Sequence, residues 1–120
     1  MLARTLTRAP KLGVRSISFN KENGYYTPDS LEDLTSHIDK TKPEFALVYF
    51  HAKWNPKCEE TDAQADELMR KNGNFTSYKI DCDEHERIKF YFDARHQPSW
   101  VIMCMGTEMG RVIGYNFEHL

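Results

Sequence analysis

Apolar positions first recur at a helical period, directly after a short segment of turn-forming residues. Leu31, Leu34 and Ile38 are spaced three and four residues apart, which places them on one face of a helix. Ser30 and Asp33 form a capping box, in which a side-chain oxygen satisfies a backbone N–H of the first turn. The pattern therefore predicts a helix that begins after Ser30 and is ended by the proline at position 43.

The pattern then changes to a continuous apolar run over residues 45–50, which has the length of a strand and contains β-branched and aromatic side chains. Such a run predicts a strand that is buried on both faces of a sheet. Residues 59–71 contain no Pro or Gly, and Ala65, Leu68 and Met69 form an apolar stripe typical of a helix. The rest of the chain predicts a strand at 75–81, a helix at 84–92 and strands at 99–105 and 108–113.

The amino-terminal segment differs in composition from everything that follows. The first 21 residues hold five of the 16 basic residues and none of the 18 acidic ones, with leucines between the charges. This composition is typical of a mitochondrial targeting leader, and a disordered basic tail is the alternative. We divide the chain into a targeting or docking leader (1–20), a linker with turn signals (21–29) and one folded domain (30–120). The leader predicts a location in the mitochondrial matrix or on the matrix side of the inner membrane.

Length and composition exclude several classes of function. A chain of 120 residues supports one domain, and its longest apolar run is too short to span a bilayer. The acidic balance after the leader argues against a nucleic-acid partner, because no basic stripe is available to neutralise phosphates. Cys58, Cys82 and Cys104 are odd in number and form no CxxC pair, so we expect free thiols in a reducing compartment.

Several landmarks in register give the chain a resemblance to the thioredoxin family over about residues 30–115. The segment VYFHAKW leads into a turn that ends at Cys58, as VDFWAxW leads into the active-site turn of thioredoxins. Further matching landmarks are Lys79-Ile80-Asp81, Phe92, Pro98 followed by Ser99, and Gly114. The resemblance implies an α/β fold, a three-layer sandwich with a mixed central sheet, and a cis peptide bond before Pro98.

The same resemblance shows where the chemistry of the family is missing. Asn55 stands where thioredoxins have the nucleophilic cysteine, and Cys58 stands at the position of the resolving one. The buried acid of the family aligns with Tyr49, and its lysine partner aligns with Ser77. Trp54, Asn55, Cys58 and Pro98 thus form a degenerate site with no catalytic residue, in which we expect Asn55 to cap the following helix. Glu59 and Glu60 beside Cys58 are expected to raise the pKa of its thiol.

No cofactor or metal is expected. Cys82 and His85 have the spacing C-x2-H, but no second close pair completes a zinc site. Three cysteines are also too few for the four thiolates of an iron–sulfur cluster.

The carboxyl end predicts an interface. Thioredoxins end with a helix across one face of the sheet, whereas only residues 115–120 follow Gly114 here, so the expected fold has a truncated last helix. A sheet face without this helix would expose an apolar patch, which usually marks a protein interface. The candidates are Trp100, Val101, Met103, Val112, Tyr115 and Phe117. Trp100 has two alternatives: pointing outward it would anchor a partner, and pointing inward it would fill space near Asn55.

Two functions follow from these expectations. The first is a non-catalytic accessory or interaction subunit of a large mitochondrial assembly, a respiratory-chain complex or the ATP synthase, with other protein subunits as partners. The alternative is a monothiol thiol–disulfide oxidoreductase or thiol-binding module that uses Cys58, which would need an external thiol for turnover.

Overall fold

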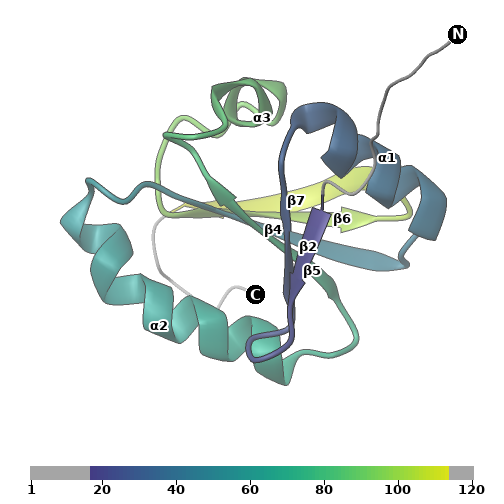
Figure 1. Ribbon diagram of the computed structural model, residues 1–120, viewed down its shortest axis with the longest axis horizontal. Helices are drawn as coiled ribbons and strands as arrows, with labels where there is room; N and C mark the ends of the chain where they lie inside the picture. The colour runs from purple at the N-terminus through teal and green to yellow at the C-terminus, as the bar shows by residue number, and fades with distance from the viewer. Residues whose placement is uncertain (1–16, 114–120) are drawn as a thin grey trace, which may run out of the picture.

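The computed structural model describes residues 17–113, apart from the side chains of Lys57 and Glu60, as a six-stranded sheet between two helical layers (Figure 1). In chain order the elements are β2 (Ile17–Asn20), β3 (Tyr25–Pro28), α1 (Leu31–Thr41), β4 (Phe45–His51), α2 (Pro56–Lys71), β5 (Thr76–Asp81), α3 (Glu86–Tyr91), β6 (Ser99–Cys104) and β7 (Thr107–Ile113). The strand order is β2-β3-β5-β4-β6-β7. No helix within 17–113 is long and apolar enough to cross a membrane.

The predicted capping box is present at the start of α1. The Ser30 hydroxyl accepts a hydrogen bond from the Asp33 backbone N–H at 3.1 Å and donates one to the Asp33 carboxylate at 2.8 Å. The helix ends at Lys42, which has a φ of 45° and whose N–H donates to the carbonyl of Ile38. The local sequence therefore determines both ends of this helix.

The predicted central strand is β4. It runs parallel to β5 and antiparallel to β6, so the sheet is mixed, as the resemblance implied. Helices α1 and α3 cover one face of the sheet and α2 covers the other (Figure 1). Because successive side chains of a strand point to opposite faces, Val48 and Phe50 enter the α1/α3 core while Leu47 and Tyr49 enter the α2 core. The three-layer α/β fold is confirmed.

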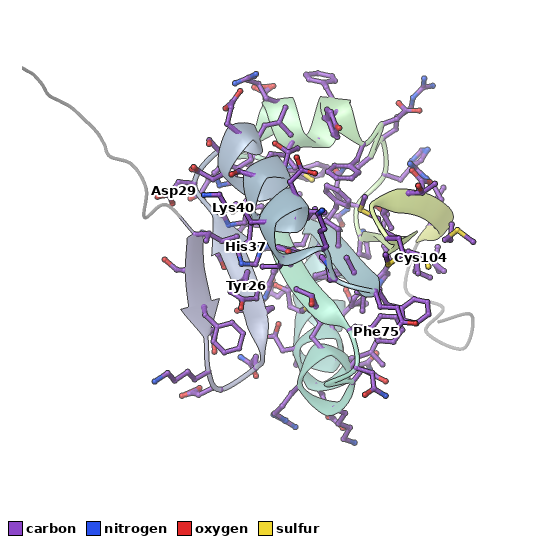
Figure 2. The ribbon with its side chains drawn as sticks, turned by 90° about the vertical axis from the view of Figure 1, so that its right-hand side faces the viewer. Tyr26, Asp29, His37, Lys40, Phe75 and Cys104 are labelled. Carbon is purple, nitrogen blue, oxygen red and sulfur yellow. The ribbon has the colours of Figure 1, made fainter. Side chains whose placement is uncertain are left out.

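The predicted linker is wrong, because the segment 21–29 contains a strand of the sheet. β2 and β3 form an antiparallel hairpin, and β3 also pairs in parallel with β5. Tyr26 of β3 packs against His37 of α1 with ring centroids 4.4 Å apart (Figure 2), and His37 Nδ1 lies 2.7 Å from the Tyr78 hydroxyl of β5. β2 also shows that the last four residues of the predicted leader belong to the sheet. The turn signals at 23–24 were correct, but they connect two strands.

Three predictions lie outside the described residues. They are the leader over residues 1–16, the truncation of the last helix after Gly114, and the interface candidates Tyr115 and Phe117.

Candidate functional site

The turn between β4 and α2 places Asn55 directly before the first helical residue, Pro56. The Asn55 backbone carbonyl accepts hydrogen bonds from the N–H groups of Cys58 at 3.0 Å and Glu59 at 3.3 Å. Proline suits the first helical position, because its missing N–H would have no partner within the helix. Asn55 therefore stands at the N-cap position, where its backbone carbonyl accepts the first bonds of the helix.

The Asn55 side chain connects this turn to the proline loop. Its amide Nδ2 donates to the backbone carbonyl of Gln97 at 2.9 Å. The Gln97–Pro98 peptide bond is cis, as the resemblance implied, and Pro98 is buried. Trp54 lies beside the turn with 68% of its surface exposed. The fold therefore brings Asn55 against the loop of Pro98 and leaves Trp54 open to solvent.

Cys58 lies at the start of α2 but is turned into the protein, with only 1% of its surface exposed. Its Sγ accepts the backbone N–H of Ala52 at 3.4 Å. Burial raises the pKa of the Cys58 thiol; the Ala52 hydrogen bond opposes this rise, whereas the carboxylates of Asp62 and Asp83 add to it. The predicted direction is confirmed, but Glu59 is not among its causes. A neutral, buried thiol is a poor nucleophile.

Tyr49 replaces the family's buried acid and is itself fully buried. Its hydroxyl donates to Asp62 Oδ1 at 2.9 Å and lies 3.3 Å from the Thr61 hydroxyl. Burial raises the pKa of Tyr49, and the Asp62 carboxylate raises it further. The phenol therefore keeps its proton and cannot act as a base toward a thiol at neutral pH.

A lysine does stand near this position, although the sequence reading missed it. Ser77, which aligns with the family's lysine, is buried opposite Leu47, and Lys79 lies two residues further along β5, directly opposite Tyr49. Lys79 Nζ donates to Asp66 Oδ1 at 3.0 Å and lies 3.7 Å from Asp62 Oδ2.

This cluster determines the charge state of Lys79. Burial disfavours the charged amine, but the hydrogen bond to Asp66 and the two carboxylates outweigh it, so the pKa of Lys79 is raised. Asp62 and Asp66 lie on α2 with their side chains turned toward β5, so that both are only partly exposed. Their i, i+4 spacing was the signal that the sequence contained.

His51 completes the cluster. Its Nδ1 lies 3.6 Å from Asp62 Oδ2, and its ring is parallel to that of Tyr49 with centroids 5.8 Å apart. Burial lowers the pKa of His51, against the opposing effect of Asp62. The imidazole is therefore uncharged at neutral pH.

Burial removes three of the proposed interface residues from the surface. Trp100 has no exposed surface and packs on Tyr49 with ring centroids 4.4 Å apart. Val101 and Met103 are buried in the α1/α3 core, and Val112 is partly buried against the α2 core. Trp100 thus points inward. The exposed apolar side chains of the β6–β7 hairpin are instead Met105, Met109 and Ile113.

The remaining candidate chemistry is not assembled in the described part of the chain. Burial raises the pKa of the Cys82 thiol to about 12, with smaller contributions from the neighbouring acids. Within residues 17–113, no three His, Cys, Asp or Glu side chains lie close enough together to hold a metal ion.

The mixed sheet, the helices on its two faces and the cis-proline loop against the start of α2 define a thioredoxin-type domain. The thioredoxin family model matches residues 27–120. The chain therefore belongs to the thioredoxin family.

Curated relatives of the chain are plant thioredoxins. The chain is similar to thioredoxin H5 of Arabidopsis thaliana, with 31% identity over 68 residues, which are 57% of this chain and 58% of that protein. It is also similar to the H-type thioredoxin of Fagopyrum esculentum, with 25% identity over 81 residues, which are 68% and 70% of the two chains. The chain thus spans less than two thirds of the first of these relatives.

Solved structures share the fold. Thioredoxin NaTrxh of Nicotiana alata superimposes with a TM-score of 0.75 at 21% identity, covering 85% of this chain and 90% of the other. The Trypanosoma brucei brucei thioredoxin superimposes with a TM-score of 0.73 at 18% identity, covering 86% of this chain and 90% of the other.

Proposed function

We propose that this chain is a thioredoxin-family protein without thiol–disulfide activity that serves as an accessory, protein-binding subunit of a large mitochondrial assembly, a respiratory-chain complex or the ATP synthase. The observation that carries the proposal is the hydrogen bond from Asn55 Nδ2 to the Gln97 carbonyl. Disulfide exchange begins with attack by a thiolate. The Asn55 side chain is an amide and cannot form a thiolate. The bond also fastens the helix start to the proline loop.

The surroundings of the remaining thiol support the same proposal. Cys58 is buried and has a raised pKa, and Tyr49 supplies a phenol where the family has a carboxylate. A thiol with a raised pKa forms little thiolate at neutral pH. Asn55, Cys58 and Tyr49 each lack a property that disulfide exchange needs. A protein that has lost this activity is expected to show such changes together.

The mitochondrial part of the proposal rests on composition. The first 21 residues carry basic side chains and no acidic ones, as targeting leaders do. Placement in an assembly rests on the retained fold together with Asn55 at the turn, and a fold alone does not determine function.

The location is tested by native electrophoresis of solubilised mitochondria from the source organism, with an antibody against the chain. We expect the chain in the band of a large complex. Migration only as a free 14.1 kDa monomer would contradict the accessory-subunit proposal. Absence from mitochondria would contradict the proposed location.

The second candidate, monothiol exchange at Cys58, is favoured by the chain's membership in the thioredoxin family. Iodoacetamide labelling between pH 6 and 11, read by mass spectrometry, tests it. We expect Cys58 to label slowly until the pH exceeds its ordinary pKa of 9.0, and the partly exposed Cys104 serves as the internal reference. Rapid labelling at pH 7, or glutathione-dependent turnover that Cys58→Ser abolishes, would establish the enzyme instead.

A further inference from the structure

A second site lies where three parallel strands end. β3, β4 and β5 run in the same direction, so their carboxyl ends meet at one edge of the sheet. In open α/β sheets, ligands commonly bind outside the carboxyl ends of the strands. The turn between β4 and α2, which contains Asn55, is one neighbour of this edge. The loop between β5 and α3, which the sequence reading connected only with a possible zinc ligand, is the other.

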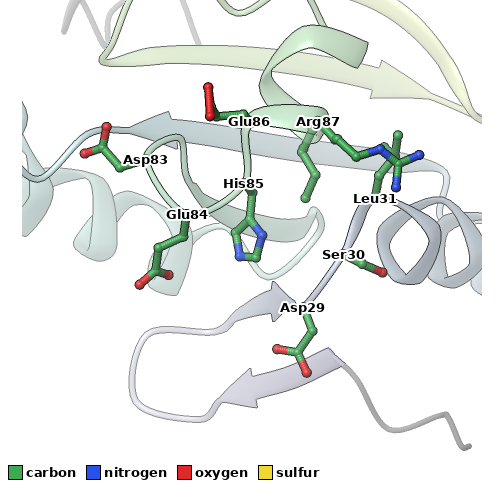
Figure 3. Close-up of a pocket in the computed structure, with 9 residues that line it drawn as sticks. Asp29, Ser30, Leu31, Asp83, Glu84, His85, Glu86 and Arg87 are labelled. Carbon is green, nitrogen blue, oxygen red and sulfur yellow. The ribbon is translucent and has the colours of Figure 1, made fainter. Parts of the chain in front are cut away.

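Two adjoining pockets occupy this edge. One, of about 220 Å³, is lined by residues from the ends of all three strands: Tyr25, Thr27, His51, Lys53, Lys79, Asp81, Glu84 and His85. The other, of about 270 Å³, lies between the start of α1 and the β5–α3 loop, with Asp29 and Leu31 on one side and Asp83 to Ile88 on the other. They share Glu84 and His85. Figure 3 shows both side chains directed from the loop toward the β2–β3 hairpin. We call the joined space the carboxyl-end groove.

The groove is acidic. Its lining carboxylates are Asp29, Asp81, Asp83, Glu84 and Glu86. Two of its three lining cations are held by carboxylates outside the groove: Lys79 by Asp66 at 3.0 Å and Arg87 by Glu32 at 2.8 Å. The third, Lys53, has a side chain that is 74% exposed. Most of the negative charge is therefore not neutralised within the groove.

Asp81 gives the groove a polar group that is buried and incompletely bonded. Only 8% of the residue is exposed, and its Oδ1 accepts the Asp83 backbone N–H at 2.9 Å. Its Oδ2 is buried and accepts no hydrogen bond from the described part of the chain, with Lys53 Nζ 3.6 Å away. A buried carboxylate oxygen is stabilised when a charged donor reaches it.

We propose that the carboxyl-end groove binds a lysine or arginine side chain of a partner polypeptide, whose cation donates to Asp81 Oδ2 in place of Lys53. Glu84 and Asp29 supply further acceptors along the groove. The Tyr25 ring, which lines the same pocket as Asp81, offers apolar surface for the methylene stem, which long basic side chains bury while their charge stays in a polar environment.

The joined pockets are lined from the end of β4 to the start of α1, a span that suits a peptide segment better than a compact free cation. This inference goes beyond the proposed function, because it holds for a catalytic and a non-catalytic chain alike.

The experiment is an NMR titration of the full chain with the acetylated, amidated peptide Gly-Arg-Gly-Arg-Gly and with its citrulline analogue, which is neutral. We expect the arginine peptide to shift the amide signals of Thr27, Asp29 and residues 51–53 and 81–87, and the citrulline peptide to leave them unchanged. Asp81→Asn should weaken binding about tenfold, since it removes the charge at the central acceptor.

Matched variants separate a built site from general electrostatic attraction. Glu84→Gln in the groove should weaken binding severalfold, whereas Glu67→Gln on the exposed face of α2 should not. Lys53→Ala should tighten binding by removing the competing cation, whereas Lys71→Ala should not. These exposed substitutions remain informative if Asp81→Asn fails to fold.

Three results would overturn the inference. One is that Glu67→Gln weakens binding of the arginine peptide as much as Glu84→Gln does. Another is that the neutral citrulline peptide shifts the same signals as strongly as the arginine peptide does. The third is tighter binding of spermine than of the peptide at the same signals, which would assign the groove to free polyamines.

Discussion

The two faces of the sheet use the same strands but differ in chemistry. On the α1/α3 face, Leu34, Val48, Phe50 and Ile88 pack in an apolar core. On the α2 face, Tyr49 and Trp100 are equally buried, yet Tyr49 directs its hydroxyl to Asp62 within a cluster of charged side chains. Alternation along one strand separates the two environments. The polar cluster around Tyr49 is therefore separated from the apolar α1/α3 core by the sheet itself.

The largest effect that this difference predicts comes from the apolar face. Phe50→Ala should lower the free energy of unfolding by about 3–5 kcal/mol, because a fully buried ring is lost and a cavity remains. Urea denaturation measures the change. Phe90→Ala removes a ring that is 70% exposed and serves as the control, for which we expect almost no change. Equal losses from the two variants would mean that Phe50 is not a core residue.

An intermediate effect is expected at the centre of the α2 face. Lys79→Met keeps most of the side-chain volume but leaves Asp62 and Asp66 without their cation, at a cost of about 2 kcal/mol. Because the folded state binds the Lys79 proton more tightly, the advantage of the wild type is complete below pH 10.5 and is lost as the pH rises through the raised pKa.

Denaturation at several pH values measures both effects. Lys71→Met, which removes the exposed i, i+4 pair with Glu67, is the control and should cost less than about 0.5 kcal/mol. Two results would show that Lys79 is not stabilised by Asp62 and Asp66. One is a loss from Lys79→Met no larger than the loss from Lys71→Met, and the other is a stability difference between the wild type and Lys79→Met that grows above pH 10.5.

The smallest effect concerns Asp62, which connects Tyr49 to His51. Asp62→Asn keeps an acceptor for the Tyr49 hydroxyl but removes the charge, so we expect a loss of about 1 kcal/mol. The carboxylate opposes the lowering of the His51 pKa by burial, so the variant should lower that pKa further. An NMR titration of the imidazole signals measures it. An unchanged or higher His51 pKa would show that the two side chains do not interact.

The same histidine predicts how the wild type responds to acid. The pKa of His51 is lowered in the folded state, so below pH 6.5 the unfolded chain binds a proton that the folded chain does not. The contribution of His51 to stability should therefore decrease as the pH falls through 6.5. His51→Gln should reduce this dependence, which denaturation at pH 5 and pH 8 would detect.

Much of the fold was predictable because its signals are local. The capping box at Ser30 and the apolar run of β4 each gave the correct element from a few neighbouring residues, whereas the cis bond before Pro98 followed from the family resemblance. The β2–β3 hairpin was missed for the opposite reason. Its strands have four residues each, and what holds β3 is the parallel pairing with β5 and the packing of Tyr26 on His37.

The candidate site, too, was predictable only in part. The sequence alone determined that the turn holds one thiol, Cys58, beside Asn55, and that a tyrosine stands at position 49, because residue identity decides which groups can ionise or attack. Only the tertiary structure decided that Trp100 turns inward, that Asp62 reaches Tyr49, and that distant residues form the carboxyl-end groove. Burial and charge pairing depend on which strands lie next to one another, and that information is not contained in any single stretch of the chain.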